Sequence, residues 1–251
     1  MTPAEAGSAV VAAVRDAVDS GELAVAVPAE VPLSGFGPGS YGTPVALRLA
    51  ARGGRDDPRE LAEVIARRLV KRPGVRDVTV AGPGYLTLVV DSPGALAAGI
   101  IAERDTYAKA DGVPHGAWPD RPRTFDNPGF SVRYAYARAA AVQRRAEDLG
   151  IPLGDPGFLK EADETALLAL LAELPSRVAQ AAREGDATPL RRHLERVADA
   201  YHRVYERCPA LPGGDHKPGA THAARRTLAE AVRVAVANAL NTIGESPRER
   251  I

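Results

Sequence analysis

One stretch near the middle of the chain limits what the sequence can fold into. Residues 108–129, AKADGVPHGAWPDRPRTFDNPG, hold four prolines and three glycines among 22 residues. Proline lacks a backbone donor and glycine loses much entropy on ordering, so neither a helix nor a central strand should continue through it. We interpret this stretch as a linker, which divides the chain into domains at residues 1–107 and 130–251.

The part before the linker combines helix and strand signals. In the segment VAGPGYLTLVV, a Gly-Pro-Gly turn lies between two β-branched runs, around residues 75–80 and 85–90, which predicts a tight hairpin. Residues 31–43 are rich in Gly and Pro and are predicted to be a loop. Helical spacing of apolar residues predicts helices at residues 3–20, 44–51, 58–72 and 92–107. The expected fold of residues 1–107 is a small α+β domain.

After the linker the strand signals end. The apolar pattern predicts four helices, over residues 130–149, 161–183, 188–207 and 221–243. Gly150 and Gly244 follow two of these helices, where a left-handed C-cap residue belongs. The sequence therefore predicts an α+β fold class overall, in which a small N-terminal α+β domain is followed by an all-α helical bundle.

Charge and cysteine content limit the choice of partner and compartment. The chain of 251 residues has 32 Lys+Arg and 32 Asp+Glu, so a nucleic-acid partner would have to meet a local basic surface. We expect no DNA partner. Cys208 is the only cysteine, which indicates a reducing compartment, and we expect the protein to be cytoplasmic. The first residues do not read as a secretory leader, and no apolar run is long enough to span a bilayer, so no membrane partner is expected.

Catalytic groups are sparse in the sequence. Asp56 and Asp57 run into Pro58, which indicates a helix start rather than a carboxylate pair. Cys208 and His202 are six residues apart, which does not place them on adjacent turns of one helix face. The histidines fit no recognised metal-ligand spacing. We therefore expect no catalytic residues, no metal and no cofactor.

Aromatic residues are few, and several share helices with arginine. Phe130, Tyr134 and Tyr136 lie on one predicted helix together with Arg138. They can form the core of the bundle, or they can bind unstacked RNA bases, for which arginine and aromatic faces together are suited. In the predicted hairpin, Tyr85 and Thr87 share one face of a strand.

The second half contains the segments DNPGFSVRYAYARAAAV, LLALLAELPSRV, YHRVYERC and ANALNTIGESPRERI, which together resemble the anticodon-binding domain, of the DALR type, of arginyl-tRNA synthetases. The segment DNPGFSVRYAYARAAAV is similar to the opening helix of that domain, with Tyr136 where the family has histidine. The segments LLALLAELPSRV, YHRVYERC and ANALNTIGESPRERI are similar to later parts, with Ile251 where methionine is usual. This resemblance implies that Tyr134, Tyr136, Arg138 and Ile251 contact the tRNA anticodon.

The first half is similar to the N-terminal domain of the same enzymes. The matching segments are GSYGTPVALRLA, DPRELAEVIARRL and VAGPGYLTLVV. The resemblance implies that Tyr85 and the residue two positions on contact a base of the tRNA D loop. That second residue is Thr87 where the family has asparagine, and a hydroxyl cannot offer the paired donor and acceptor of an amide.

Complete members of this family carry a Rossmann catalytic domain between these two domains, with a His-Ile-Gly-His type signature. Here that interval is the linker, and His-x-Gly-His does not occur in the sequence. We therefore predict a noncatalytic paralogue that binds tRNA, arginine tRNA being the first candidate, beside a separate synthetase or tRNA-dependent enzyme. The alternative is a protein-interaction module that has lost RNA binding.

Overall fold

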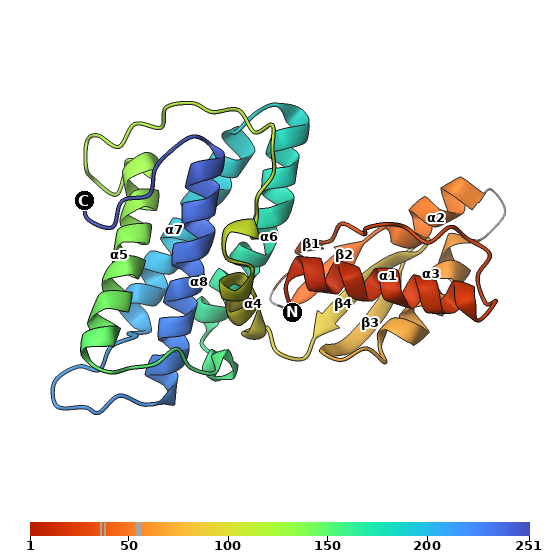
Figure 1. Cartoon of the computed structure of the whole chain (residues 1–251), viewed down its shortest axis with the longest axis horizontal. Coiled ribbons are helices and arrows are strands. Elements are labelled where there is room, and N and C mark those ends of the chain that lie inside the picture. The colour runs from red at the N-terminus through yellow and green to blue at the C-terminus, as the bar shows by residue number, and fades with distance from the viewer. Residues whose placement is uncertain (36, 38, 54–56) are drawn as a thin grey trace. The chain divides into compact units, whose positions relative to one another are not determined.

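The computed structural model describes residues 1–35, 37, 39–53 and 57–251. It consists of two compact units, Met1–Pro93 and Gly94–Ile251, each with its own core (Figure 1).

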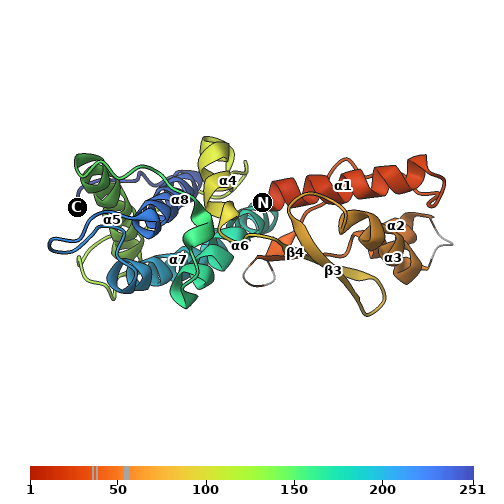
Figure 2. The same cartoon turned by 90° about the horizontal axis from the view of Figure 1, so that it is seen from below.

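The first unit is an antiparallel sheet with helices on one of its faces (Figure 2). The strand order is β1-β2-β4-β3. The helices are α1 (Pro3–Asp19), α2 (Val45–Gly53) and α3 (Pro58–Leu69), and the strands are β1 (Ser34–Gly35), β2 (Ser40–Thr43), β3 (Val75–Ala81) and β4 (Tyr85–Val90). The predicted hairpin is confirmed as β3 and β4. The predicted loop at residues 31–43 is wrong in part, because β1 and β2 lie within it.

Burial alternates along β4, as a sheet with one covered face requires. Leu86, Leu88 and Val90 are buried against the helices, whereas Tyr85 and Thr87 are only partly covered. The turn before β4 uses glycines in the left-handed region, Gly82 at φ 54° and Gly84 at φ 124°. The Asp57 side chain caps α3 by accepting from the Arg59 amide at 2.8 Å, which confirms the predicted helix start. Asp56 lies outside the described residues.

The second unit is a helical bundle around α8. Its helices are α4 (Ala95–Glu103), α5 (Pro128–Asp148), α6 (Ala162–Glu184), α7 (Thr188–Arg207) and α8 (Ala220–Thr242), with short 3-10 turns η1 (Arg104–Thr106) and η2 (Pro156–Phe158). The four helices predicted after the linker are confirmed to within about two residues at each end. Gly150 and Gly244 have φ of 65° and 83°, as expected of C-caps. Among the described residues, no helix is both long and apolar enough to cross a membrane.

The boundary between the two units lies earlier in the chain than the sequence indicated. Helix α4 was expected in the first domain, which was taken to end at residue 107, but it packs against α8 of the bundle. The reason is its composition: Leu96 and Ile100 are buried, and the helix has almost no polar face to leave in water. The Tyr107 hydroxyl then donates to the Leu171 carbonyl at 2.6 Å.

Residues 108–129 contain no helix before α5, as expected, yet they are bound to the bundle rather than free. The Trp118 amide donates to the Glu245 carboxylate at 2.7 Å, and Arg191 donates to the Gly116 carbonyl at 2.5 Å. Arg133 on α5 completes this arrangement with an ion pair to Glu245 at 2.5 Å. The stretch therefore holds the C-terminal segment against α5.

Candidate nucleic-acid interface

A cluster of aromatic rings surrounds one arginine in the second unit. We call it the aromatic–arginine cluster, and it consists of Phe125, Phe130, Tyr134, Arg138, His202 and Tyr205. The Phe130 and Tyr134 rings stack with centroids 5.4 Å apart, and Phe125 meets Tyr134 edge-on at 5.5 Å. The Arg138 guanidinium carbon lies 4.5 Å from the Tyr205 ring centroid and 4.8 Å from that of Tyr134. The Phe125 ring centroid is 5.6 Å from the same carbon, so Arg138 is held by cation–π contacts with three rings.

Helical spacing accounts for most of this cluster. Phe130, Tyr134 and Arg138 are four residues apart on α5 and so lie above one another on one face. Asn127 starts the helix, with its side-chain oxygen accepting from the Phe130 amide at 3.2 Å. This cap also places the preceding residues, Phe125 included, beside the first turn. Helix α7 contributes His202 and Tyr205, which complete the cluster from the neighbouring helix.

His202 is neutral in this arrangement. Arg138 can only donate, so its contact of 3.2 Å with Nδ1 of His202 makes that nitrogen an acceptor. The proton is then on Nε2, which lies 3.2 Å from the Ser131 carbonyl oxygen. Burial, followed by the positive charge of Arg138, lowers the pKa of His202. The guanidinium also lies 3.6 Å from the exposed carboxylate of Glu206.

The outer part of the cluster is a platform for a planar ring. Phe125 is 55% exposed although its ring contacts three others. An exposed aromatic face with a cation behind it favours stacking with a nucleobase. Sequence reasoning did not select Phe125, because it lies in the stretch interpreted as a linker. Its position two residues before the helix cap was the signal that could have identified it.

Tyr136, which the resemblance placed with Tyr134, lies on another face of α5. Tyr136 is 5% exposed and points away from the Tyr134 face, because two residues along a helix turn a side chain by roughly 200°. Ile251 is 38% exposed and follows Glu249, which pairs with Arg144 of α5 at 3.1 Å. Arg144 lies roughly 120° around the helix from Arg138. The structure brings Tyr134 and Arg138 together and does not bring Tyr136 to them.

In the first unit, Tyr85 and Thr87 lie on the sheet face that the helices leave open. Thr87 is opposite Gly42 on β2 and Thr79 on β3, so both share its face. The Tyr85 ring lies over Gly42, where an added Cβ would come within 2.4 Å of the Tyr85 hydroxyl oxygen. Glycine at position 42 therefore makes room for the ring. This face offers an aromatic surface beside hydroxyl groups that can each donate and accept.

Two other kinds of group were considered in the sequence, the Cys208 thiol and the residue types that can ligate a metal ion. Cys208 is buried, and burial raises the pKa of its thiol, which disfavours the nucleophilic thiolate. Among the described residues, no three His, Cys, Asp or Glu side chains are placed to hold a metal ion together.

Comparison with known families defines the class of each unit. Residues 7–90 match the arginyl tRNA synthetase N terminal domain, and residues 132–251 match the DALR anticodon binding domain. The two matches cover most of the chain. The chain therefore consists mainly of two domains related to those of arginyl-tRNA synthetases, which confirms the resemblance seen in the sequence.

Individual relatives agree with this assignment. An arginine–tRNA ligase of Clavibacter sepedonicus is 44% identical over 131 residues, and one of Frankia alni is 40% identical over 133 residues. Each alignment covers 51% of this chain and 24% of the relative. The matching region thus spans about a quarter of the length of each of these ligases. Residues 91–131 of this chain lie between the two family matches.

Proposed function

We propose that this protein binds tRNA, arginine tRNA being the first candidate, and does not aminoacylate it alone. The observation that carries the proposal is the aromatic–arginine cluster on α5 of a domain that matches an anticodon-binding family. In this proposal the bundle holds the anticodon stem-loop, and the open sheet face of the first unit contacts the D loop through Tyr85 and Thr87.

The cluster supports stacking more than hydrogen-bonded base reading. The Arg138 side chain is only 16% exposed and contacts three rings as well as His202 and Glu206, so little of its guanidinium is accessible to a base. Its role is to fix the rings and to place a positive charge behind them. Exposed arginines of the bundle, such as Arg145 and Arg192, are suited to phosphate contacts, which position a nucleic acid without reading its sequence.

The lack of a recognisable ATP-binding signature supports a noncatalytic role. Aminoacylation requires groups that position ATP and arginine and stabilise the reacting phosphate. The interval between the two matched domains is short, and His-x-Gly-His does not occur in the sequence. We propose that the protein acts in the cytoplasm, in trans with a separate synthetase or with an enzyme that uses charged tRNA.

A binding titration with arginine tRNA and an unrelated tRNA, each at two salt concentrations, tests the proposal. We expect salt-dependent binding that is tighter for arginine tRNA, because neutralised phosphates release counterions. Tyr134→Ala should weaken binding about 5- to 150-fold, the loss expected for one stacked base. Arg138→Glu should weaken it further. Phe158→Ala is the matched control, since it removes a ring that is 48% exposed and lies outside the cluster.

Two results would contradict this placement. Wild-type affinity in both Tyr134→Ala and Arg138→Glu would show that the cluster is not the binding surface. Absence of binding to either tRNA at low salt would instead favour a protein-interaction module. For that second candidate the structure offers three exposed apolar side chains around the α5–α6 connection, Leu149, Leu153 and Phe158.

A separate substitution tests the sheet face. Gly42→Ala should displace the Tyr85 ring, because the new methyl group would overlap the position of its hydroxyl. We expect tRNA affinity to fall by about tenfold, as for a misplaced stacking ring, while the free energy of unfolding changes by less than about 1 kcal/mol. Affinity and urea unfolding are measured on the same sample. Unchanged affinity would remove the Tyr85 face from the interface.

A further inference from the structure

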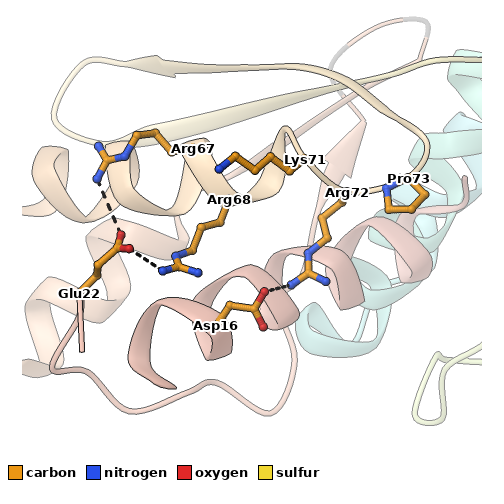
Figure 3. Close-up of a pocket in the computed structure, with 7 residues that line it drawn as sticks. All are labelled: Asp16, Glu22, Arg67, Arg68, Lys71, Arg72 and Pro73. Atoms are coloured by element: carbon orange, nitrogen blue, oxygen red, sulfur yellow. Dashed lines mark hydrogen bonds and ion pairs between the residues drawn. The ribbon is translucent and has the colours of Figure 1, made fainter. Parts of the chain in front are cut away.

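A basic groove lies in the first unit between α1 and the end of α3 (Figure 3). It has a volume of about 380 Å³. Its lining consists of four cationic side chains, two carboxylates and a proline: Arg67, Arg68, Lys71, Arg72, Asp16, Glu22 and Pro73. Because α3 packs on the covered face of the sheet, the groove is separate from the open face that carries Tyr85 and Thr87.

Two of the four cations are fixed by the two carboxylates. Arg68 donates to Glu22 and to the Ser20 hydroxyl, both at 2.5 Å, and Arg72 donates to Asp16. These bonds join α3 and the turn after it to the end of α1. They hold the two guanidinium groups in the wall of the groove, so a ligand would find both groups already in position (Figure 3).

The other two cations are largely uncompensated. Arg67 is 63% exposed and lies 3.9 Å from Glu22, which already binds Arg68 at 2.5 Å. Lys71 is exposed and makes no ion pair within the described part of the chain, and Figure 3 shows its ammonium without a bond to the other lining residues. The groove therefore carries two positive charges in excess of its carboxylates.

Four cations within six consecutive residues repel one another, and the chain as a whole is neutral. The last turn of α3 accounts for some of this charge, since Arg67 and Arg68 complement the helix dipole. It does not account for Lys71 and Arg72, which follow the helix. An anion with several oxygen atoms would relieve the repulsion, and guanidinium forks beside an ammonium suit phosphate oxygens in particular.

We propose that this groove binds consecutive phosphate groups, as present in an RNA backbone or in a small polyphosphorylated molecule. Arg68 and Arg72 form the fixed wall, and Arg67 and Lys71 close on the ligand. The site is independent of the proposed aromatic contacts with tRNA, because its recognition requires no base.

The test uses calorimetric titration of the full chain with inorganic tripolyphosphate and, separately, with short oligouridine at two salt concentrations. The double variant Arg67→Ala/Lys71→Ala should weaken tripolyphosphate binding about tenfold or more, because two charged donors are lost. It keeps the Arg68 and Arg72 ion pairs and should therefore fold. The matched control Arg48→Ala/Arg52→Ala removes two exposed charges one turn apart on α2.

For oligouridine, the groove variant should also reduce the slope of log affinity against log salt by about 1.4, or about 0.7 for each lost contact. Binding of both probes through the groove identifies a nucleic-acid backbone as the source of phosphate, and binding of tripolyphosphate alone identifies a small molecule. Tyr134→Ala should leave tripolyphosphate binding unchanged, which separates this site from the bundle. No tripolyphosphate binding, or equal losses in the groove and α2 variants, would overturn the proposal.

Discussion

Replacing Arg225 with methionine should lower the free energy of unfolding of the helical bundle by about 3–5 kcal/mol. Arg225 on α8 donates through Nε to Glu164 of α6 at 2.7 Å, and Glu164 has no exposed surface. Without the guanidinium, the carboxylate remains buried with no opposite charge. The loss is large because desolvation of that charge is no longer offset, as happens when one member of a buried ion pair is removed.

Urea unfolding of two further variants isolates this cause. Glu164→Gln in the Arg225→Met background should recover part of the loss, because the neutral side chain can still accept from the Glu161 amide, a bond of 3.0 Å in the wild type. Arg207→Met is the matched control, since Arg207 is 69% exposed and 3.4 Å from Asp163, and should cost less than about 1 kcal/mol. Equal costs for Arg225→Met and Arg207→Met would contradict the explanation.

Local pattern was sufficient for most of the elements, the short strands β1 and β2 excepted, but not for their assignment to a core. The helices of the bundle follow from apolar spacing, and the β3–β4 hairpin follows from its Gly-Pro-Gly turn. Helix α4 was also located correctly, yet it packs on α8, more than a hundred residues later in the chain. An apolar helix next to a linker can bury its surface in either neighbouring domain, so its own sequence does not determine which core receives it.

The candidate site was predictable where its residues share a helix. Tyr134 and Arg138 are one turn apart, and the structure places them in contact. His202 comes from a different helix, so only tertiary packing reveals that it accepts from Arg138. Tyr136 was grouped with Tyr134 because both lie on one helix and because of the resemblance, whereas helix geometry already directs it to another face. The contacts of the candidate site that sequence reasoning missed therefore come mainly from the packing of α5 against α7.

Acidification should destabilise the bundle through two buried histidines. Burial, and for His202 also the charge of Arg138, lowers the pKa of His193 and His202 in the folded chain. The unfolded chain takes up these protons near the ordinary value of about 6.5, so below that pH it binds more protons than the folded chain. Unfolding free energy should then fall as pH decreases, by up to about 1.4 kcal/mol per pH unit for each histidine.

Urea unfolding at a series of pH values from neutral to mildly acidic measures this slope. His202→Gln and His193→Gln should each flatten it, while His216→Gln, at an exposed position outside the bundle core, should not. For His193 the nearby charges are Glu173 on α6, whose carboxylate is 3.8 Å from Nδ1, and Arg196 and Arg177. Identical slopes in all four proteins would show that other groups control the acid response. A slope reduced by His202→Gln would connect stability to the aromatic–arginine cluster, because a protonated His202 could no longer accept from Arg138.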